Sequence, residues 1–259
     1  MKFIELHQHF ERWASASFAE NYDNVGLIVG EYDTEITGIL VNLEVTEEVL
    51  EEAIQLGCNL LVTHHPIWFQ ARKKLNGEDY VSRIIMKAIR NHIGLYAIHT
   101  NLDSVISGVN RKIAEILELE IIGFIKKHPT LEVGSGIYGN LKAPVSFENF
   151  LSTLKEKFQV PCIRYSRAFH KPLIQKIAIC GGSGSFLIPE VFNLKVDAFV
   201  TADITYHKFF DNEGQFYLID IGHYESEQYT CEIILDYLKS ISNFAVYLSK
   251  IKTNPVQYY

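Results

Sequence analysis

The stretch that most constrains the fold is Leu60-Leu61-Val62-Thr63-His64-His65-Pro66, an apolar run that stops at two adjacent histidines. Consecutive aliphatic residues are typical of a strand buried on both faces, and Pro66 has no N–H with which to continue a ladder. We therefore expect the histidines just past a strand end, although two histidines alone are also compatible with a solvated loop. In open α/β sheets this edge binds ligands, and neutral imidazole is a common metal ligand.

Strand-like and helix-like segments alternate around this stretch, which indicates parallel strands joined by helices. The segment after residue 98 reads His99-Thr100-Asn101-Leu102-Asp103, so a second apolar strand also ends in metal-capable side chains. The expected elements of this half are a helix over 3–13, a strand over 36–43, a helix from Thr46 to Gly57, a helix over 79–91, a strand over 95–98 and a helix capped by Ser107.

Turn residues accumulate between residues 121 and 141, and we predict a boundary there between a first α/β lobe, 1–124, and a second, 125–259. The segment Gly181-Gly182-Ser183-Gly184-Ser185 follows a predicted strand and either contacts a phosphate through its N–H groups or forms a tight structural turn. The other expected elements are a helix over 147–158 capped by Ser146, a strand over 174–180 and a helix over about 228–241.

An internal repeat is visible when Ile39 is placed over Ile177. The two windows then run without a gap to Val-Thr in both halves, and His65 corresponds to Asp203. Further on, residues 95–98 resemble residues 216–219. Two matches in the same order predict a duplicated α/β unit, and hence two similar lobes with the metal site between them.

The formal net charge of −7 argues against binding to duplex nucleic acid, because neutralising phosphates requires clustered Lys and Arg. The four cysteines lie far apart and form no C-x-x-C pair, which is typical of a reducing cytosol. The first residues lack a secretory h-region, and no apolar window approaches the roughly 18 residues that span a bilayer. We therefore expect a cytoplasmic protein that does not bind membranes.

Five side chains fall just past predicted strand ends or at a helix entrance, namely His64, His65, Asp103, His223 and Glu227. His223 and Glu227 are four residues apart and share one face if they lie on a helix. Imidazoles and carboxylates without thiolate suit two divalent ions, and five ligands leave coordination positions open for water. Glu227 is the candidate to bridge ions roughly 3.5–4 Å apart, the spacing of two-metal hydrolases.

Other residues have expected roles around this centre. His99 is expected to hold a ligating carboxylate in position instead of binding an ion. Asp203 and His207 are candidates for proton transfer or substrate contact, with a polar turn as the alternative, and Trp68 and Phe69 follow the double histidine closely enough to form a pocket wall.

Six groups of motifs occur in order along the chain. They are Asp23-Asn24-Val25-Gly26-Leu27 with Val29-Gly30, Thr63-His64-His65-Pro66, His99-Thr100-Asn101-Leu102-Asp103, Ile179-Cys180-Gly181-Gly182-Ser183-Gly184, Thr201-Ala202-Asp203 with Tyr206-His207, and Gly222-His223-Tyr224 with Ser226-Glu227. Together they resemble the motifs of the Nif-three-like dinuclear metal-centre family, many of whose members are labelled GTP cyclohydrolase I type 2. Tyr22 stands where this family usually has a tryptophan, and Ala202 where it has a glycine.

The resemblance implies two α/β lobes related by a pseudo-twofold axis and a homohexamer with the metal sites facing an internal cavity. It implies the same five ligands, and attack of a metal-bound water on the purine ring of GTP. We therefore expect a dinuclear metal-dependent hydrolase that acts on a nucleotide or related small molecule, with Glu227, Asp203 and His207 in catalytic roles. The alternative is a metal-binding scaffold or regulator without turnover. The ions would be Zn, Fe, Mn or Co, which this ligand set does not distinguish.

Overall fold

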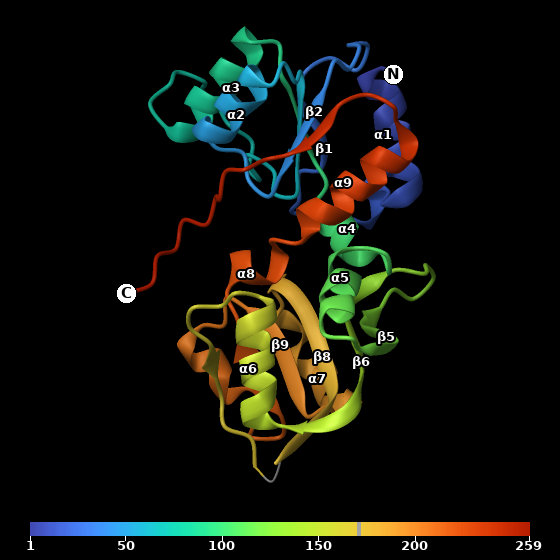
Figure 1. Cartoon of the computed structure of the whole chain (residues 1–259), viewed down its shortest axis with the longest axis vertical. Helices are drawn as coiled ribbons and strands as arrows, with labels where there is room; N and C mark the ends of the chain where they lie inside the picture. Colours follow the sequence, from blue (N-terminus) through green and yellow to red (C-terminus); the bar gives the residue numbers. More distant parts are fainter. Residues whose placement is uncertain (170–171) are drawn as a thin grey trace. The chain divides into compact units, whose positions relative to one another are not determined.

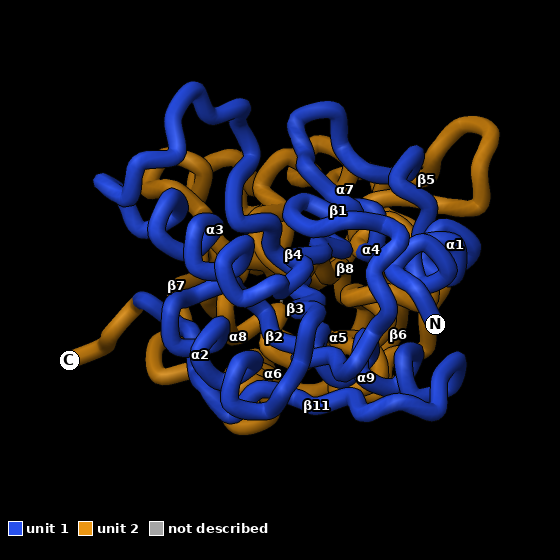
Figure 2. The backbone as a smooth tube through the Cα atoms, turned by 90° about the horizontal axis from the view of Figure 1, so that it is seen from above, with its two compact units in different colours: residues 1–102, 230–255 blue, residues 103–229, 256–259 orange. Residues whose placement is uncertain are grey.

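The structure, a computed structural model, describes residues 1–169 and 172–259 and contains two compact units (Figure 2). Unit 1 comprises Met1–Leu102 and Thr230–Pro255, and unit 2 comprises Asp103–Tyr229 and Val256–Tyr259. This division differs from the one predicted at residues 124 and 125. Asp103 falls in unit 2, and the chain returns to unit 1 after Tyr229, a crossing that composition along the sequence cannot reveal.

Unit 1 is built on a five-stranded sheet in the order β1-β4-β3-β2-β11. The bounds are β1 Gly26–Val29, β2 Ile39–Asn42, β3 Leu60–Thr63, β4 Gly94–Ala97 and β11 Val246–Leu248. The strands β11, β2, β3 and β4 pair in parallel, whereas β1 pairs antiparallel with β4. The carboxyl ends of β3 and β4 therefore lie next to each other at one edge, with Thr63 opposite Ala97.

Helices cover both faces of this sheet, with α2 and α3 on one side and α1 and α9 on the other (Figure 1). Their bounds are α1 Phe3–Trp13, the 3-10 helix η1 Ala16–Phe18, α2 Glu47–Gln55, α3 Tyr80–Arg90 and α9 Thr230–Ile241. The predicted cap of α2 is confirmed, because the Val49 N–H donates to Thr46 Oγ1 at 3.2 Å. Asp79 caps α3 in the same way, accepting from the Ser82 N–H at 2.9 Å.

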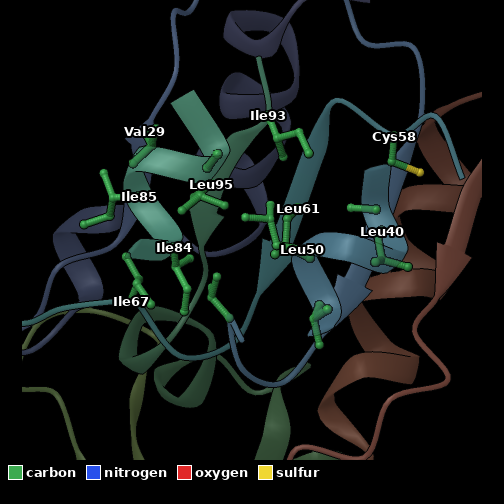
Figure 3. Packing of buried hydrophobic residues seen from close by; sticks show 14 of the residues in the cluster. Val29, Leu40, Leu50, Cys58, Leu61, Ile67, Ile84, Ile85, Ile93 and Leu95 are labelled. Atoms are coloured by element: carbon green, nitrogen blue, oxygen red, sulfur yellow. The ribbon is translucent and has the colours of Figure 1, made fainter. Parts of the chain in front are cut away.

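The core of unit 1 lies between this sheet and the α2–α3 layer (Figure 3). Leu40, Leu61 and Leu95 point from three neighbouring strands toward Leu50 of α2 and Ile84 of α3, and all five are almost completely buried. Full burial of each such side chain stabilises the fold by about 1.5–3 kcal/mol. The packing fixes the strand ends that carry His64, His65 and His99.

Unit 2 is built on a six-stranded sheet in the order β5-β6-β8-β9-β10-β7. The strand bounds are β5 Glu120–Lys127, β6 Gly134–Ser146, β7 Arg164–Tyr165, β8 Leu173–Ser183, β9 Ala198–Ala202 and β10 Tyr217–Asp220. The three strands β8, β9 and β10 pair in parallel, and the flanking strands are antiparallel. Val191, Ala178 and Phe199 belong to one buried cluster that packs a helix onto this sheet.

The helices of unit 2 are short, and none in the described ranges combines the length and hydropathy needed to cross a membrane. Their bounds are α5 Val109–Ile116, α6 Phe147–Lys157, η2 Ser185–Leu187, α7 Ile188–Leu194, η3 Tyr206–Phe210 and α8 His223–Glu227, and α4 Thr100–Ser104 spans the boundary between the units. Ser146 caps α6 as predicted, accepting from the Asn149 N–H at 3.2 Å. The predicted cap at Ser107 is wrong, because the residue at that helix entrance is Gly108.

The glycine-containing segment 121–141 was interpreted as a boundary, but it forms most of the antiparallel pair β5–β6. The glycines have a structural reason. A Cβ on Gly139 would collide with the Glu120 carbonyl oxygen, and one on Gly134 with the Lys126 carbonyl oxygen. Glycine within a strand often marks such close backbone approach, so here it does not indicate a loop.

The mixed α/β class is confirmed, and in both sheets three strands that follow one another along the chain pair in parallel in that order, β2-β3-β4 in unit 1 and β8-β9-β10 in unit 2. Ile39 pairs with Leu60 in unit 1, and Ile177 pairs with Ala198 in unit 2, which is the register that the sequence repeat predicts. The third strand needs a different match, because Leu95 lies opposite Leu61 and Leu218 lies opposite Phe199. Leu95 therefore corresponds to Leu218 and not to Phe216, while the duplication itself stays a prediction.

Candidate functional site

Three histidines of unit 1 lie together at the carboxyl ends of β3 and β4, and we call His64, His65 and His99 the imidazole cluster. The ring centroid of His64 lies 4.9 Å from that of His65, and the ring of His99 lies 5.1 Å from each of them. One ring nitrogen from each residue can be chosen so that all three lie within 4.8 Å of one another. His64 is fully buried, and the side chains of His65 and His99 are each 11% exposed.

Each ring of the cluster is fixed through Nδ1. His64 Nδ1–H donates to the Ile98 carbonyl oxygen at 2.9 Å. His65 Nδ1–H donates to Glu44 Oε1 at 2.6 Å, and His99 Nδ1–H donates to Asp23 Oδ1 at 2.9 Å. Carbonyl and carboxylate oxygens only accept hydrogen bonds, so the proton of each neutral ring is on Nδ1 and the lone pair is on Nε2. Metal-ligating histidines in proteins are typically held in this way.

Asp23 is the anchor of His99 and of the start of α4. Its buried carboxylate also accepts hydrogen bonds from the Thr100 N–H at 3.1 Å and from the Thr100 hydroxyl. Burial raises the pKa of Asp23, but the hydrogen bonds from His99 and Thr100 outweigh this effect and lower it to about 2. The carboxylate is therefore charged at neutral pH. Sequence reasoning named Asp23 only as part of a family motif and assigned no role to Glu44, and only the fold brings these acids to the histidines.

The site residues of unit 2 that we expected to bind metal are Asp103, His223 and Glu227, and we call them the carboxylate–histidine cluster. The helix α8 begins at His223 and ends at Glu227, so the predicted sharing of one helical face is confirmed. His223 Nε2 lies 3.0 Å from Glu227 Oε2, and the Glu227 side chain is only 3% exposed. His223 Nδ1–H donates to Asp203 Oδ2 at 2.6 Å.

Asp103 approaches the same part of unit 2 as Glu227. Burial raises the pKa of the Cys180 thiol above its ordinary value, and the negative charges of Asp103 and Glu227 raise it further. Both carboxylates therefore lie near one thiol at the end of β8. Asn110 Nδ2–H donates to the Asp103 carbonyl oxygen at 3.2 Å, which ties α5 to the residue.

His223 lies between two carboxylates, which changes its protonation. Burial lowers its pKa, but the hydrogen bonds with Asp203 and Glu227 outweigh this effect and raise it to about 11. The pKa of Asp203 changes in the matching direction, because the hydrogen bond from His223 lowers it. Asp203 has φ of 55°, a left-handed conformation that is uncommon for an aspartate and that occurs at functional sites.

A family model described as Duf34/NIF3 (NGG1p interacting factor 3) matches residues 1–255. The chain belongs to this family. The resemblance inferred from the sequence motifs is thereby confirmed.

Relatives of this DUF34/NIF3 chain carry the name GTP cyclohydrolase 1 type 2 homolog. One from Clostridium acetobutylicum is 34% identical over 230 residues, which cover 88% of this chain and 85% of the relative. One from Campylobacter jejuni is 30% identical over 260 residues and covers 100% of both chains.

Solved structures of the same family have the same fold. A Staphylococcus aureus hypothetical protein has a TM-score of 0.89 and 30% sequence identity, with coverage of 100% of this chain and 99% of that chain. A Bacillus cereus protein related to NIF3 has a TM-score of 0.87 at 22% identity, with coverage of 100% and 99%, a likeness that concerns the fold.

The glycine-rich turn of this NIF3 chain, residues 181–185, contacts α8 through the bond from Gly182 to Ser226. Three of its N–H groups, which would be needed to bind a phosphate, donate to side chains of the protein. The bonds are from Gly181 to Asn110 Oδ1 at 3.0 Å, from Gly182 to Ser226 Oγ at 2.9 Å and from Gly184 to Thr201 Oγ1 at 2.9 Å. This arrangement favours the structural turn over the phosphate contact.

Gly182 shows why the turn contains no side chain at this point. It has φ of +61°, and a Cβ added there would collide with Glu227 Oε1 and would lie 3.3 Å from His223 Cε1. At Gly182 the backbone thus comes closer to the His223 ring and the Glu227 carboxylate than it could if the residue carried a Cβ atom. The turn therefore shapes the space around the carboxylate–histidine cluster.

Asp203 and His207, the two predicted catalytic candidates outside the ligand set, have different surroundings. Asp203 holds the Nδ1 of His223, which is the role of a positioning residue. His207 lies on η3, is exposed and packs edge-on against Tyr206 with ring centroids 5.2 Å apart. The contacts described for His207 thus give it no part in holding the donors.

Proposed function

We propose that this protein is a metal-dependent hydrolase in which His64, His65, Asp103, His223 and Glu227 hold two divalent ions. The observation that carries the proposal is the common orientation of the imidazoles. His64, His65 and His223 each commit Nδ1 to an oxygen acceptor, which directs Nε2 toward a further electrophile. Such uniform fixing of several rings is expected of metal ligands and has little value for surface histidines.

The donor chemistry fits borderline divalent ions such as Zn, Fe, Mn or Co. The imidazole cluster supplies nitrogens, and the carboxylate–histidine cluster adds carboxylate oxygens and one nitrogen. Neither cluster offers a thiolate ligand among its members, which distinguishes them from closed structural zinc sites. Each cluster by itself has too few donors for two ions, so we propose that both contribute to one dinuclear centre. Asp103 lies in α4, and His99, four positions earlier, immediately precedes this helix.

The sequence-based expectation that His99 holds a ligating carboxylate in position stays a prediction, and the contacts of His99 suggest a second role. Its ring belongs to the imidazole cluster, and its Nδ1 is fixed by Asp23 as firmly as the Nδ1 of His65 is fixed by Glu44. We propose that His99 orients substrate or water beside the ions, or completes one coordination sphere when the other ligands leave a position open. The hydrogen bond described for the Nδ1 of His99 goes to Asp23 and not to the proposed ligand Asp103, which favours these roles over positioning of a ligating carboxylate.

Glu227, Asp203 and His223 would each have a distinct role at the proposed metal centre. When bound, divalent ions polarise substrate oxygens and lower the pKa of coordinated water. Glu227 has two carboxylate oxygens, so it can donate to both ions, and Asp203 holds the imidazole of His223 in the orientation that presents Nε2. His223 Nε2 lies 3.0 Å from Glu227 Oε2, and a bound ion would take the place of a proton between them.

The name of the relatives, GTP cyclohydrolase 1 type 2 homolog, supports a nucleotide as the substrate class. We propose a nucleotide as substrate, with hydrolysis of a bond in the purine ring or at a phosphate.

The direct test uses protein purified without added metal, followed by elemental analysis and by turnover assays with GTP and with phosphodiesters. We expect about two ions per chain and turnover that depends on them. Glu227→Gln should lower turnover by at least about a hundredfold, because the amide lacks the negative charge with which Glu227 would hold the ions. Glu156→Gln, the same change at an exposed position of α6, is the matched control. Unchanged turnover in a metal-loaded Glu227→Gln protein would contradict the proposal.

A second candidate function is a metal-binding scaffold or regulator without turnover. It is favoured by the description of the family as an NGG1p interacting factor, which refers to a partner protein. Full metal occupancy together with no turnover across Zn, Fe, Mn and Co would support the scaffold. Sedimentation of the metal-loaded protein tests the homohexamer that the family resemblance implies.

A further inference from the structure

Two exposed aromatic side chains of unit 1 lie beside the imidazole cluster. The Phe69 ring centroid is 5.6 Å from that of His99, at an interplanar angle of 56°. The Tyr22 ring lies 6.5 Å from the Phe69 ring, at 53°. Tyr22 is 65% exposed and Phe69 is 47% exposed, so both side chains are accessible to solvent, and Phe69 lies next to the ring of His99. We call Tyr22 and Phe69 the aromatic pair.

The aromatic pair is not a loose part of the surface. Tyr22 immediately precedes Asp23, whose carboxylate holds both His99 and Thr100. Phe69 follows Trp68, which packs against the core of unit 1 and whose carbonyl oxygen accepts from Asn24 Nδ2–H at 3.0 Å. The two segments are therefore tied to each other and to His99. Exposed aromatic rings held in this way are pre-positioned for a ligand.

Positive charge follows Phe69 along its own loop, which joins β3 to α3. Arg72, Lys73 and Lys74 are all exposed, in a chain whose formal net charge is −7. Arg72 is paired with Asp79 at the start of α3. Lys73 and Lys74 come four and five residues after Phe69, which favours a ligand that joins a flat ring to an anionic group.

We propose that the aromatic pair stacks on the planar heteroaromatic ring of a mononucleotide-sized ligand and that Lys73 and Lys74 attract its phosphate. The inference deepens the proposed function, because the stacked ring would lie against His99 of the imidazole cluster. Stacking on a flat ring suits every base, with purines favoured by their larger face. A nucleic-acid strand is disfavoured as occupant by the overall charge of the chain.

The test is a binding titration that needs no turnover. GMP, AMP, CMP and UMP are titrated into the full-length protein by calorimetry, with ribose 5-phosphate as the probe without a ring and guanosine as the probe without a phosphate. We expect both purine nucleotides to bind more tightly than the pyrimidine nucleotides, and ribose 5-phosphate to bind at least about tenfold more weakly than GMP. Guanosine should bind more weakly than GMP, by a factor that shrinks in high salt.

Variants assign the effect to the aromatic pair. Phe69→Leu and Tyr22→Leu keep an apolar side chain but remove the ring, and each should weaken GMP binding by roughly tenfold. Tyr80→Leu is the matched control, because Tyr80 is 60% exposed in the same unit and lies at the start of α3. Lys73→Gln with Lys74→Gln should weaken GMP binding and leave guanosine binding unchanged.

The outcomes that overturn the inference are distinct from failure of the proposed function. If the unchanged protein binds no nucleotide, or if Phe69→Leu and Tyr22→Leu bind GMP as tightly as Tyr80→Leu does, the aromatic pair is not a base-stacking site. If the two variants instead change the sedimentation coefficient, the aromatic pair is a contact between copies of the chain. Metal content, measured on the same samples, reports the proposed function separately.

Discussion

The parallel strands β2, β3 and β4 of unit 1 and β8, β9 and β10 of unit 2 have the same order but different chemistry. Both middle strands carry a Val-Thr pair at or near the carboxyl end, with Thr63 the last residue of β3 and Thr201 the next-to-last residue of β9, and their register with the first strand is the same. Unit 1 continues with His64 and His65, whereas unit 2 continues with Ala202 and Asp203. Equivalent strand ends therefore carry two proposed metal ligands in unit 1 and, in unit 2, a carboxylate that accepts a hydrogen bond from His223. The two residues after each Val-Thr pair thus set which side chains the sheet presents at this edge.

The third strands extend the comparison. A five-residue helix begins three positions after β4 and three positions after β10, namely α4 at Thr100 and α8 at His223. The first residue of each helix donates a hydrogen bond to an aspartate, Thr100 to Asp23 and His223 to Asp203. A threonine there only anchors the helix, whereas a histidine also offers Nε2. The same arrangement of strand, aspartate and short helix thus holds a threonine in unit 1 and, in unit 2, a histidine that we propose as a metal ligand.

The largest expected effect comes from removing the proposed metal-ligating histidines, in unit 1 and in unit 2 separately. His64→Ala or His65→Ala in unit 1, and His223→Ala in unit 2, should each lower the affinity for an ion at least about a hundredfold, because removing a ligand costs more than removing its orienting partner. His128→Ala, on an exposed ring between β5 and β6, is the control. Competition with a chelator measures the affinities. Loss of affinity for the unit 1 variants alone would show that α8 holds no ion.

Changing the residues that hold the rings should have the next largest effect. Glu44→Gln frees His65 Nδ1 from a charged acceptor, and Asp203→Asn does the same for His223. Both should lower metal affinity about 10- to 100-fold. Each amide still accepts a hydrogen bond through its oxygen, so Glu44→Ala and Asp203→Ala should lose more than the amide variants. An amide variant as weak as its alanine counterpart would mean that charge, and not orientation, is what these acids contribute.

Much of this architecture could be predicted from the sequence, for reasons that particular residues make clear. The run at residues 60–66 predicted a strand end because an apolar segment and a proline have local causes, and Thr46 and Ser146 predicted helix starts in the same way. Asp23 and Glu44 were missed as partners of the histidines because each pairing spans many residues and depends on strand order.

The division of the chain was equally hidden from local reasoning. The glycines of β6 have the composition of a turn, although close backbone contact with β5 is what requires them. The return of the chain to unit 1 at Thr230 likewise depends on where α9 packs, which no short window of sequence encodes. Local signals thus predicted strand ends and caps, while contacts between distant segments decided the partners of those ends.

A glycine substitution tests whether the backbone of unit 2 is built around Glu227. Gly182→Ala should destabilise the fold by about 1–2 kcal/mol from its left-handed conformation alone, and further through the collision with Glu227. Gly57→Ala in unit 1 is the matched control, because Gly57 has φ of +68° and a Cβ there would meet no atom within 4 Å. Urea denaturation measures both. Equal losses for the two variants would mean that Glu227 moves aside without cost.

The smallest expected effect compares the helix caps of the two units. Thr46→Ala and Ser146→Ala each remove a hydroxyl that accepts from a backbone N–H of the first turn, at 3.2 Å in both helices. Each should lower the free energy of unfolding by about 1 kcal/mol, whereas Thr46→Ser and Ser146→Thr should be nearly neutral because they retain the acceptor. Hydrogen exchange at the Val49 and Asn149 amides localises the effect to α2 or to α6. Faster exchange at both amides in one variant would show that the two units open together, so that a local cap stabilises the whole chain.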